Sequence, residues 1–152
     1  MTSRSDQLWA SGRAPNEERR RGTHDLSAGE GLHVPDDRVP EISVVIVTPD
    51  GYETIRTTMW HLRAQTARDR LEIVIVAPSV DALHLDHTEL QEFLRFRVVE
   101  VGEVRSIAEG SAAGVRQASA PVVALAEDHA YPDPDWAAAL IGAHRHPWAA
   151  AG

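Results

Sequence analysis

The sequence contains no cysteine, which excludes a disulfide framework, a thiolate metal site and a cysteine nucleophile. It also contains no lysine, since all 15 of its Lys and Arg residues are arginine. The absence of lysine excludes Schiff-base chemistry and the phosphate-binding lysine of P-loop proteins. The arginine-containing N-terminus, Met1 to Gly22, has no continuous apolar run. We therefore expect neither a secretory signal nor a transmembrane segment, and we expect a reducing, cytoplasmic location.

Length and charge narrow the class of protein. A chain of 152 residues is long enough for one domain with a core and too short for two ordinary ones. The formal net charge of -8 repels polyanions and so argues against a nucleic-acid partner. A small anionic ligand stays compatible with this charge if local groups or a metal ion offset it.

The chain divides at about residue 40. Residues 1–40 are rich in Ser, Gly, Pro, Arg and acidic side chains, and their few apolar residues follow no period. Such a composition is typical of a disordered or loosely docked tail. We therefore expect a tail over residues 1–40 and one folded domain over residues 41–152.

Within the predicted domain, short apolar strands alternate with segments of helical period. The predicted strands are Ile42–Val47, Leu71–Val76, Phe96–Val101 and Pro121–Ala126. This alternation implies parallel pairing with right-handed crossovers. The predicted fold class is α/β, with a Rossmann-like, doubly wound, mainly parallel sheet and helices on both faces.

Capping signals and apolar spacing predict the helices between these strands. Asp50 with Glu53, and Asp86 with Glu89, are expected to cap two helices, the first of which should run to about Gln65. The last helix should open at Asp133-Pro134 and extend through His144. Another helix is predicted from an apolar stripe, which consists of Val104, Ile107, Ala108, Val115 and Ala118.

Polar residues follow the first and fourth predicted strands directly. If the sheet builds outward in both directions from the first strand, Thr48-Pro49-Asp50 and Glu127-Asp128-His129 meet at a topological switch point, where ligands bind in such folds. Two carboxylates and an imidazole can share a divalent cation. The alternative is a polar turn that carries no metal, with Asp133 as a helix N-cap.

Two blocks of the sequence resemble family-2 glycosyltransferases of the GT-A fold. Glu41–Thr48, with Tyr52–Arg56 and Leu62–Thr66 after it, is similar to the opening strand and helix of that family. Ala120–His129, followed by Pro132–Trp136, is similar to the strand, Asp-x-Asp region and following helix, with Glu-Asp-His at the Asp-x-Asp position. The resemblance implies the nucleotide-sugar-binding half of a GT-A domain, and it extends from about Glu41 to the C-terminus.

The resemblance also implies roles for particular residues. The loop of Thr48, Pro49 and Asp50, together with Glu53, would contact the nucleotide. Glu127 and Asp128 would lie near the ribose or sugar of a nucleoside diphosphate sugar. Asp128 and His129 would hold a divalent metal, with manganese favoured over magnesium because manganese accepts mixed nitrogen and oxygen ligands.

The function that follows is hexosyl-type glycosyl transfer from a nucleoside diphosphate sugar to an unidentified acceptor. No residue in this sequence is assigned as the base that deprotonates the acceptor, so we expect a partner chain or further sequence to supply the acceptor half. The alternative function is a truncated or degenerate, non-catalytic GT-A module that binds a nucleotide or a partner protein. Trp60 and Trp136 are interpreted as helix-packing residues rather than as sugar-stacking platforms, although Trp136 is near enough to the site to serve as either.

Overall fold

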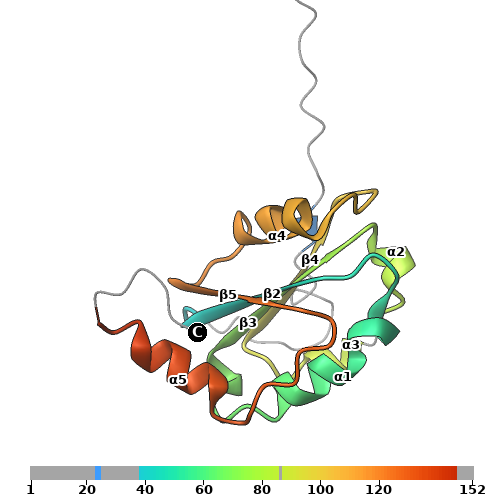
Figure 1. Cartoon of the computed structure of the whole chain (residues 1–152). Helices are drawn as coiled ribbons and strands as arrows, with labels where there is room; N and C mark the ends of the chain where they lie inside the picture. Colours follow the sequence, from blue (N-terminus) through green and yellow to red (C-terminus); the bar gives the residue numbers. More distant parts are fainter. Residues whose placement is uncertain (1–22, 25–37, 86, 147–152) are drawn as a thin grey trace, which may run out of the picture.

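The computed structural model describes residues 23–24, 38–85 and 87–146 of the chain. Their central feature is a sheet with the strand order β1-β4-β3-β2-β5 (Figure 1). The strands are β1 (Thr23–His24), β2 (Ile42–Val47), β3 (Leu71–Ala77), β4 (Arg95–Glu100) and β5 (Val122–Ala126). Strands β2 to β5 are parallel, whereas β1 pairs antiparallel with β4. The predicted mainly parallel sheet is confirmed.

Helices cover both faces of this sheet (Figure 1). The helices are α1 (Tyr52–Arg63), the 3-10 helix η2 (Arg68–Arg70), α2 (Val80–Leu83), α3 (His87–Leu90), α4 (Ile107–Val115) and α5 (Trp136–Ala143). One core cluster joins the sheet to α1 and α5, and the other joins the opposite face to α4. The predicted α/β class with helices on both faces is therefore confirmed.

Strand burial follows from this layering. Every residue of β2 and β3 is buried, as expected for central strands covered on both faces. The edge strand β5 instead alternates: Val122 and Ala124 are buried, whereas Val123 and Leu125 are exposed. α1 and α5 cover one face of β5, whereas α4 packs on the other face of the sheet, mainly against β2 and β3.

The predicted apolar stripe of α4 is wrong. Ile107 and Val115 are exposed, and the buried side of α4 consists of Gly110, Ala113 and Gly114. A Cβ atom at Gly110 would lie 2.7 Å from Val47 Cγ1, so only glycine permits this approach. The helix packs through its smallest residues, because close contact with the valines of the sheet leaves no room for larger ones.

Two predicted helix starts also need correction. The N-cap of α1 is Gly51, with no side-chain cap hydrogen bond, so Asp50 and Glu53 are not a capping pair. Thr48 instead closes the turn before the helix, since its Oγ1 accepts a hydrogen bond from the Gly51 N–H at 3.3 Å. α5 begins at Trp136 rather than at Asp133-Pro134, and its N-cap Asp135 forms no side-chain cap hydrogen bond. Asp86 lies outside the described residues, so its pairing with Glu89 stays a prediction.

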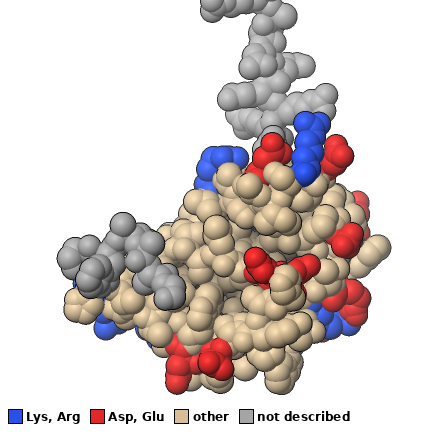
Figure 2. Space-filling model, viewed as in Figure 1, with Lys and Arg blue, Asp and Glu red and all other residues tan. Residues whose placement is uncertain are grey.

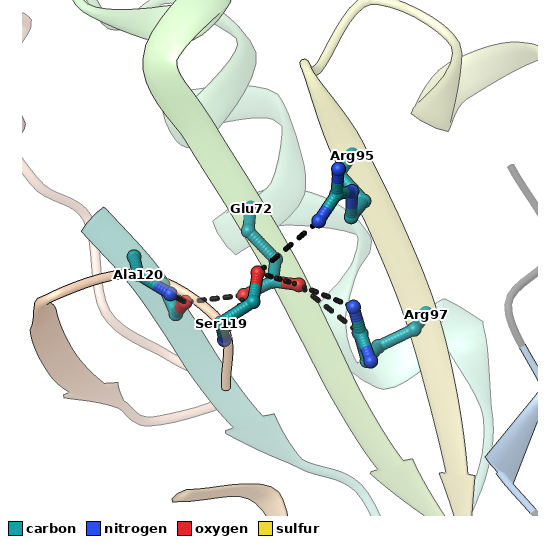
Figure 3. A network of polar contacts seen from close by, with 6 residues as sticks. Glu72, Arg95, Arg97, Ser119 and Ala120 are labelled. Atoms are coloured by element: carbon teal, nitrogen blue, oxygen red, sulfur yellow. Dashed lines mark hydrogen bonds and ion pairs between the residues drawn. The ribbon is translucent and has the colours of Figure 1, made fainter. Parts of the chain in front are cut away.

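A buried carboxylate fixes the amino-terminal end of the sheet (Figure 3). Glu72 of β3 is fully buried and accepts hydrogen bonds from Arg97 Nε at 3.0 Å, from the Ser119 N–H at 2.7 Å and from the Ser43 hydroxyl. Ser43 Oγ in turn accepts from the Ala120 N–H at 3.1 Å. These bonds join three neighbouring strands to the connection that enters β5.

Most of the predicted tail, residues 1–22 and 25–37, lies outside the described residues. Two described residues of the predicted tail, Thr23 and His24, pair with Val99 and Val98 of β4. None of the helices in the described ranges is long and apolar enough to span a membrane.

Candidate functional site

The ends of β2 and β5 lie side by side at the carboxyl edge of the sheet. Ile46 of β2 is aligned with Ala126 of β5, and each strand ends within one residue of this pair. β3 flanks β2 on its other side, so the chain builds outward in both directions from β2. The two predicted loops, Thr48-Pro49-Asp50 and Glu127-Asp128-His129, therefore meet at a topological switch point, as predicted.

The loop after β2 is closed by one hydroxyl. Thr48 is fully buried, and its Oγ1 donates to the Gly51 carbonyl at 3.0 Å. Its backbone N–H continues the sheet by bonding to the Val76 carbonyl at 2.9 Å. Pro49 and Asp50 are exposed at the tip of the loop. Thr48 thus shapes the loop from within, while Asp50 is the side chain available to a ligand.

The loop after β5 gathers two carboxylates around one imidazole. His129 Nδ1 lies 2.7 Å from Asp128 Oδ1, and His129 Nε2 lies 3.1 Å from Glu127 Oε2. The side chains of Glu127 and His129 are largely exposed, and that of Asp128 is half-buried. The hydrogen bond to Asp128, followed by the charges of Glu127 and Asp128, raises the pKa of His129 above its ordinary value.

This arrangement bears on the predicted metal site. Both ring nitrogens of His129 face carboxylates, and the described residues contain no group of three His, Asp or Glu side chains arranged to hold a metal ion. The two carboxylates nevertheless converge on a single imidazole. Carboxylate oxygens are the ligands that hard divalent cations prefer, so the donor set of Glu127 and Asp128 fits such an ion.

Thr58 of α1, and Gln65 two residues beyond the end of α1, hold the connection between β5 and α5 in place. The Thr58 hydroxyl donates to the Asp128 carbonyl at 2.7 Å, and Gln65 Nε2 donates to the Asp133 carbonyl at 2.7 Å. Gln65 Oε1 also accepts from the Ala137 N–H at 2.9 Å, at the start of α5. Thr58 and Gln65 are buried. Figure 1 shows the chain passing from β5 along α1 before it reaches α5.

Glu53 is oriented by a neighbour on its own helix. Its exposed side chain forms an ion pair with Arg56, three residues along α1. Arg56 also contacts Glu89 at 3.5 Å. The buried Tyr52 donates its hydroxyl to Glu89 at 2.9 Å, and burial together with this bond raises the pKa of Tyr52. Glu53 therefore stands at the start of α1, beside the first loop, with its charge partly neutralised.

Acidic side chains form several separate groups on the face seen in Figure 1, one of them near its centre (Figure 2). The candidate site adds to this charge, because Asp50, Glu127 and Asp128 lie on its two loops. An anionic ligand bound there would need a cation between itself and these carboxylates.

Two residues that support the site, Thr58 and Gln65, were not predicted from the sequence. Thr58 and Gln65 were read only as parts of a helix, because a buried hydroxyl or amide facing a distant loop has no local sequence signal. Trp60 was interpreted as a packing residue, but its side chain is 62% exposed, so that prediction is wrong. Trp136 does pack, since it is partly buried against the core cluster.

Comparison with known proteins identifies the fold. No curated protein matches the chain. Among solved structures, Staphylococcus aureus TarS has 18% sequence identity and a TM-score of 0.58, covering 69% of this chain and 20% of TarS. The mannosyltransferase PcManGT from Pyrobaculum calidifontis, solved with GDP-Man and Mn2+, has 23% identity and a TM-score of 0.58, covering 74% of this chain and 34% of that protein. The matched region thus spans about a third or less of the length of these proteins.

A family model supplies the stronger result. The model of glycosyl transferase family 2 matches residues 43–151, which is well over half of the chain. The match includes both loops of the candidate site, the strands β3 to β5, and all of β2 except its first residue. The chain therefore belongs to glycosyl transferase family 2, and its described strands and helices adopt the GT-A type of α/β fold.

Proposed function

We propose that residues 41–152 bind a nucleoside diphosphate sugar at the carboxyl ends of β2 and β5 and present it for hexosyl-type transfer. The observation that carries this proposal is the juxtaposition of the two polar loops at the switch point, where Ile46 is aligned with Ala126. Family membership supports sugar transfer over the non-catalytic alternative. The lack of cysteine supports a reducing compartment such as the cytoplasm.

In this proposal each loop contacts a different part of the donor. Thr48, Pro49 and Asp50, with Glu53 at the start of α1, contact the nucleoside. Because α1 begins directly after this loop, its positive amino end faces the same edge of the sheet and favours the diphosphate. From the other loop, Glu127 and Asp128 accept hydrogen bonds from ribose or sugar hydroxyls.

The proposal includes a divalent cation between the diphosphate and the loop after β5, held by Asp128 and His129. Its role when bound would be to neutralise charge on the departing diphosphate. To act as a ligand, the His129 nitrogen must be unprotonated and must leave its contact with Asp128. We expect manganese to be preferred to magnesium, since magnesium favours an all-oxygen shell. The neighbouring mannosyltransferase was solved with Mn2+.

Calorimetric titration tests the donor site. UDP, GDP and GDP-mannose would be added to the full chain with manganese, with magnesium or with chelator. We expect at least one of these ligands to bind more tightly with manganese than with chelator. Asp128→Asn should remove most of this increment, because Asp128 is one of the two residues proposed to hold the cation.

Asp69→Asn is the matched control, because Asp69 is an exposed carboxylate in η2, at the opposite edge of the sheet. It should bind like the wild type. The proposal fails for this chain if no nucleotide binds at millimolar concentration, or if Asp128→Asn and Asp69→Asn respond alike to manganese.

A further inference from the structure

An aromatic patch lies beside the candidate donor loop. It consists of Trp60 and His61 of α1 and Tyr131 of the connection between β5 and α5. The ring centroids of Trp60 and His61 are 4.9 Å apart with perpendicular planes, and those of His61 and Tyr131 are 5.2 Å apart. Trp60 is 62% exposed and Tyr131 is 59% exposed. Two large rings thus face solvent on either side of one imidazole.

Core packing does not explain these rings. The buried side of α1 is formed by Tyr52, Ile55, Thr58, Met59 and Leu62. Trp60 follows Met59 by one residue, which turns it about 100° away from the core. A single exposed apolar residue is ordinary, but adjoining exposed aromatic rings indicate a surface that contacts a ligand or partner.

The protein holds Tyr131 in place from both sides. The Asp128 carbonyl, three residues before it, is bound by Thr58 at 2.7 Å, and the Asp133 carbonyl, two residues after it, is bound by Gln65 at 2.7 Å. Thr58 and His61 have the i, i+3 spacing that places residues on one side of a helix, and Gln65 lies two residues beyond the end of α1. The loop is therefore fixed against the side of α1 that carries His61, and binding does not have to order it.

The chemistry of the patch favours a carbohydrate. A sugar ring has an apolar face of C–H groups and a rim of hydroxyls. Aromatic rings cover the first, while the His61 nitrogens and the Tyr131 hydroxyl can bond to the second. Nearby Glu127, Asp128 and Asp133 would repel an acidic saccharide, so charge favours a neutral one.

We propose that the aromatic patch is a binding platform for a neutral oligosaccharide, which it holds next to the donor loop. His129 and Tyr131 are two residues apart in the same connection, so a chain on the platform would end close to the candidate donor site. This role as an acceptor-side platform rests on the proposed function, whereas saccharide binding itself can be measured without any nucleotide.

Titrations of the full chain with cellohexaose, mannohexaose and chitohexaose test the proposal, with hexagalacturonate as the anionic comparison. Binding would be followed by NMR chemical shifts in the absence of nucleotide and metal. We expect at least one neutral hexasaccharide to bind, and Trp60→Ala and Tyr131→Ala each to weaken it about tenfold. Trp60→Phe, which keeps a ring, should retain part of the affinity.

Ile107→Ala is the matched control, because it removes an exposed apolar side chain from α4, on the opposite face of the sheet. It should bind the saccharide like the wild type. Circular dichroism checks that each variant is folded. If Trp60→Ala does not fold, the affinity of Trp60→Phe for the saccharide tests the proposal instead. Sedimentation of wild type and Trp60→Ala would show whether the patch serves self-association instead.

Three outcomes would overturn the platform. They are failure of every neutral hexasaccharide to bind at millimolar concentration, unchanged binding in both Trp60 variants, and tighter binding of hexagalacturonate. Loss of self-association in Trp60→Ala without a saccharide effect would also overturn it. These results can be distinguished from a failure of the donor site. Asp128→Asn should keep saccharide binding, and Trp60→Ala should keep nucleotide binding.

Discussion

The Thr58 hydroxyl donates to the backbone carbonyl of Asp128 at 2.7 Å, and this bond ties the candidate donor loop to α1. The two residues are 70 positions apart, and Thr58 is completely buried. The orientation of Asp128 therefore depends on a helix that begins at the end of the other loop of the site. This hydrogen bond joins the loop after β5 to the helix that follows the loop after β2.

Thr58→Val should loosen this loop with little change in side-chain volume. The Asp128 carbonyl would lose its donor, which costs about 1–3 kcal/mol of unfolding free energy for a buried group. Amide exchange at Ala130, whose N–H bonds to the Glu127 carbonyl at 3.1 Å, should become faster. Thr57→Val, on the exposed side of α1, is the control and should change neither quantity. Equal behaviour of the two variants would show that the bond does not position the loop.

Gly114→Ala should destabilise the protein, because the added Cβ would collide with Val45 and Val76 of the sheet. Overpacking of this kind costs about 1–3 kcal/mol in chemical denaturation. Gly142→Ala is the matched helical control, since no atom outside its own turn of helix lies within 4 Å of the added Cβ. It should be neutral or stabilising by up to about 1 kcal/mol. A stable Gly114→Ala protein would mean that α4 does not approach the sheet so closely.

Glu72→Ala should cost about 3–5 kcal/mol of unfolding free energy, since it leaves Arg97 and the Ser119 N–H without their buried acceptor. Asp69→Ala removes an exposed carboxylate that pairs with Arg38 at 3.4 Å, and it should change stability by less than about 1 kcal/mol. Urea denaturation of the two variants checks the difference. Similar losses in both would contradict the buried network.

His129 should titrate above its ordinary value, because both neighbouring carboxylates favour its charged form. Asp128→Asn should lower the pKa of His129, since it removes the carboxylate whose hydrogen bond to His129 is the largest cause of the shift. The raised pKa means that this pairing stabilises the fold at pH values below the ordinary histidine pKa and is lost as the pH rises through the folded value. NMR titration of the His129 ring protons measures this directly. The same midpoint in wild type and Asp128→Asn would disprove the pairing.

The fold was largely predictable because its signals are local. The valine and isoleucine runs that become β2 and β3 are bounded by turn residues, and their burial on both faces makes them uniformly apolar. The helix-packing face of α4 was not predictable from hydrophobicity, because contact is made by Gly110 and Gly114 while Ile107 faces outward. Close packing depends there on the absence of side chains, which an apolar pattern does not register.

The position of the candidate site was predictable from the sequence, but the buried side chains that hold its loops in place were not. Thr48 and Glu127 follow apolar strands, and strand order alone brings them to one edge. Glu72 interrupts an apolar strand, and Ser43 interrupts another at the aligned position, so their pairing had a weak signal in the sequence. Thr58 gave none, because its partner is a backbone carbonyl.

Manganese broadening in NMR spectra tests the donor site most directly. Bound manganese selectively broadens the signals of nearby amides, so a trace amount added with the nucleoside diphosphate that binds best would locate the ion. The proposed site predicts loss of the amide signals of Asp50 and of Glu127, Asp128 and Ala130, while Glu72 and Ser119 at the opposite edge stay sharp. Broadening centred on His84 and His87, or on His144 and His146, with the Glu127–Ala130 signals unchanged, would contradict a donor site at the ends of β2 and β5.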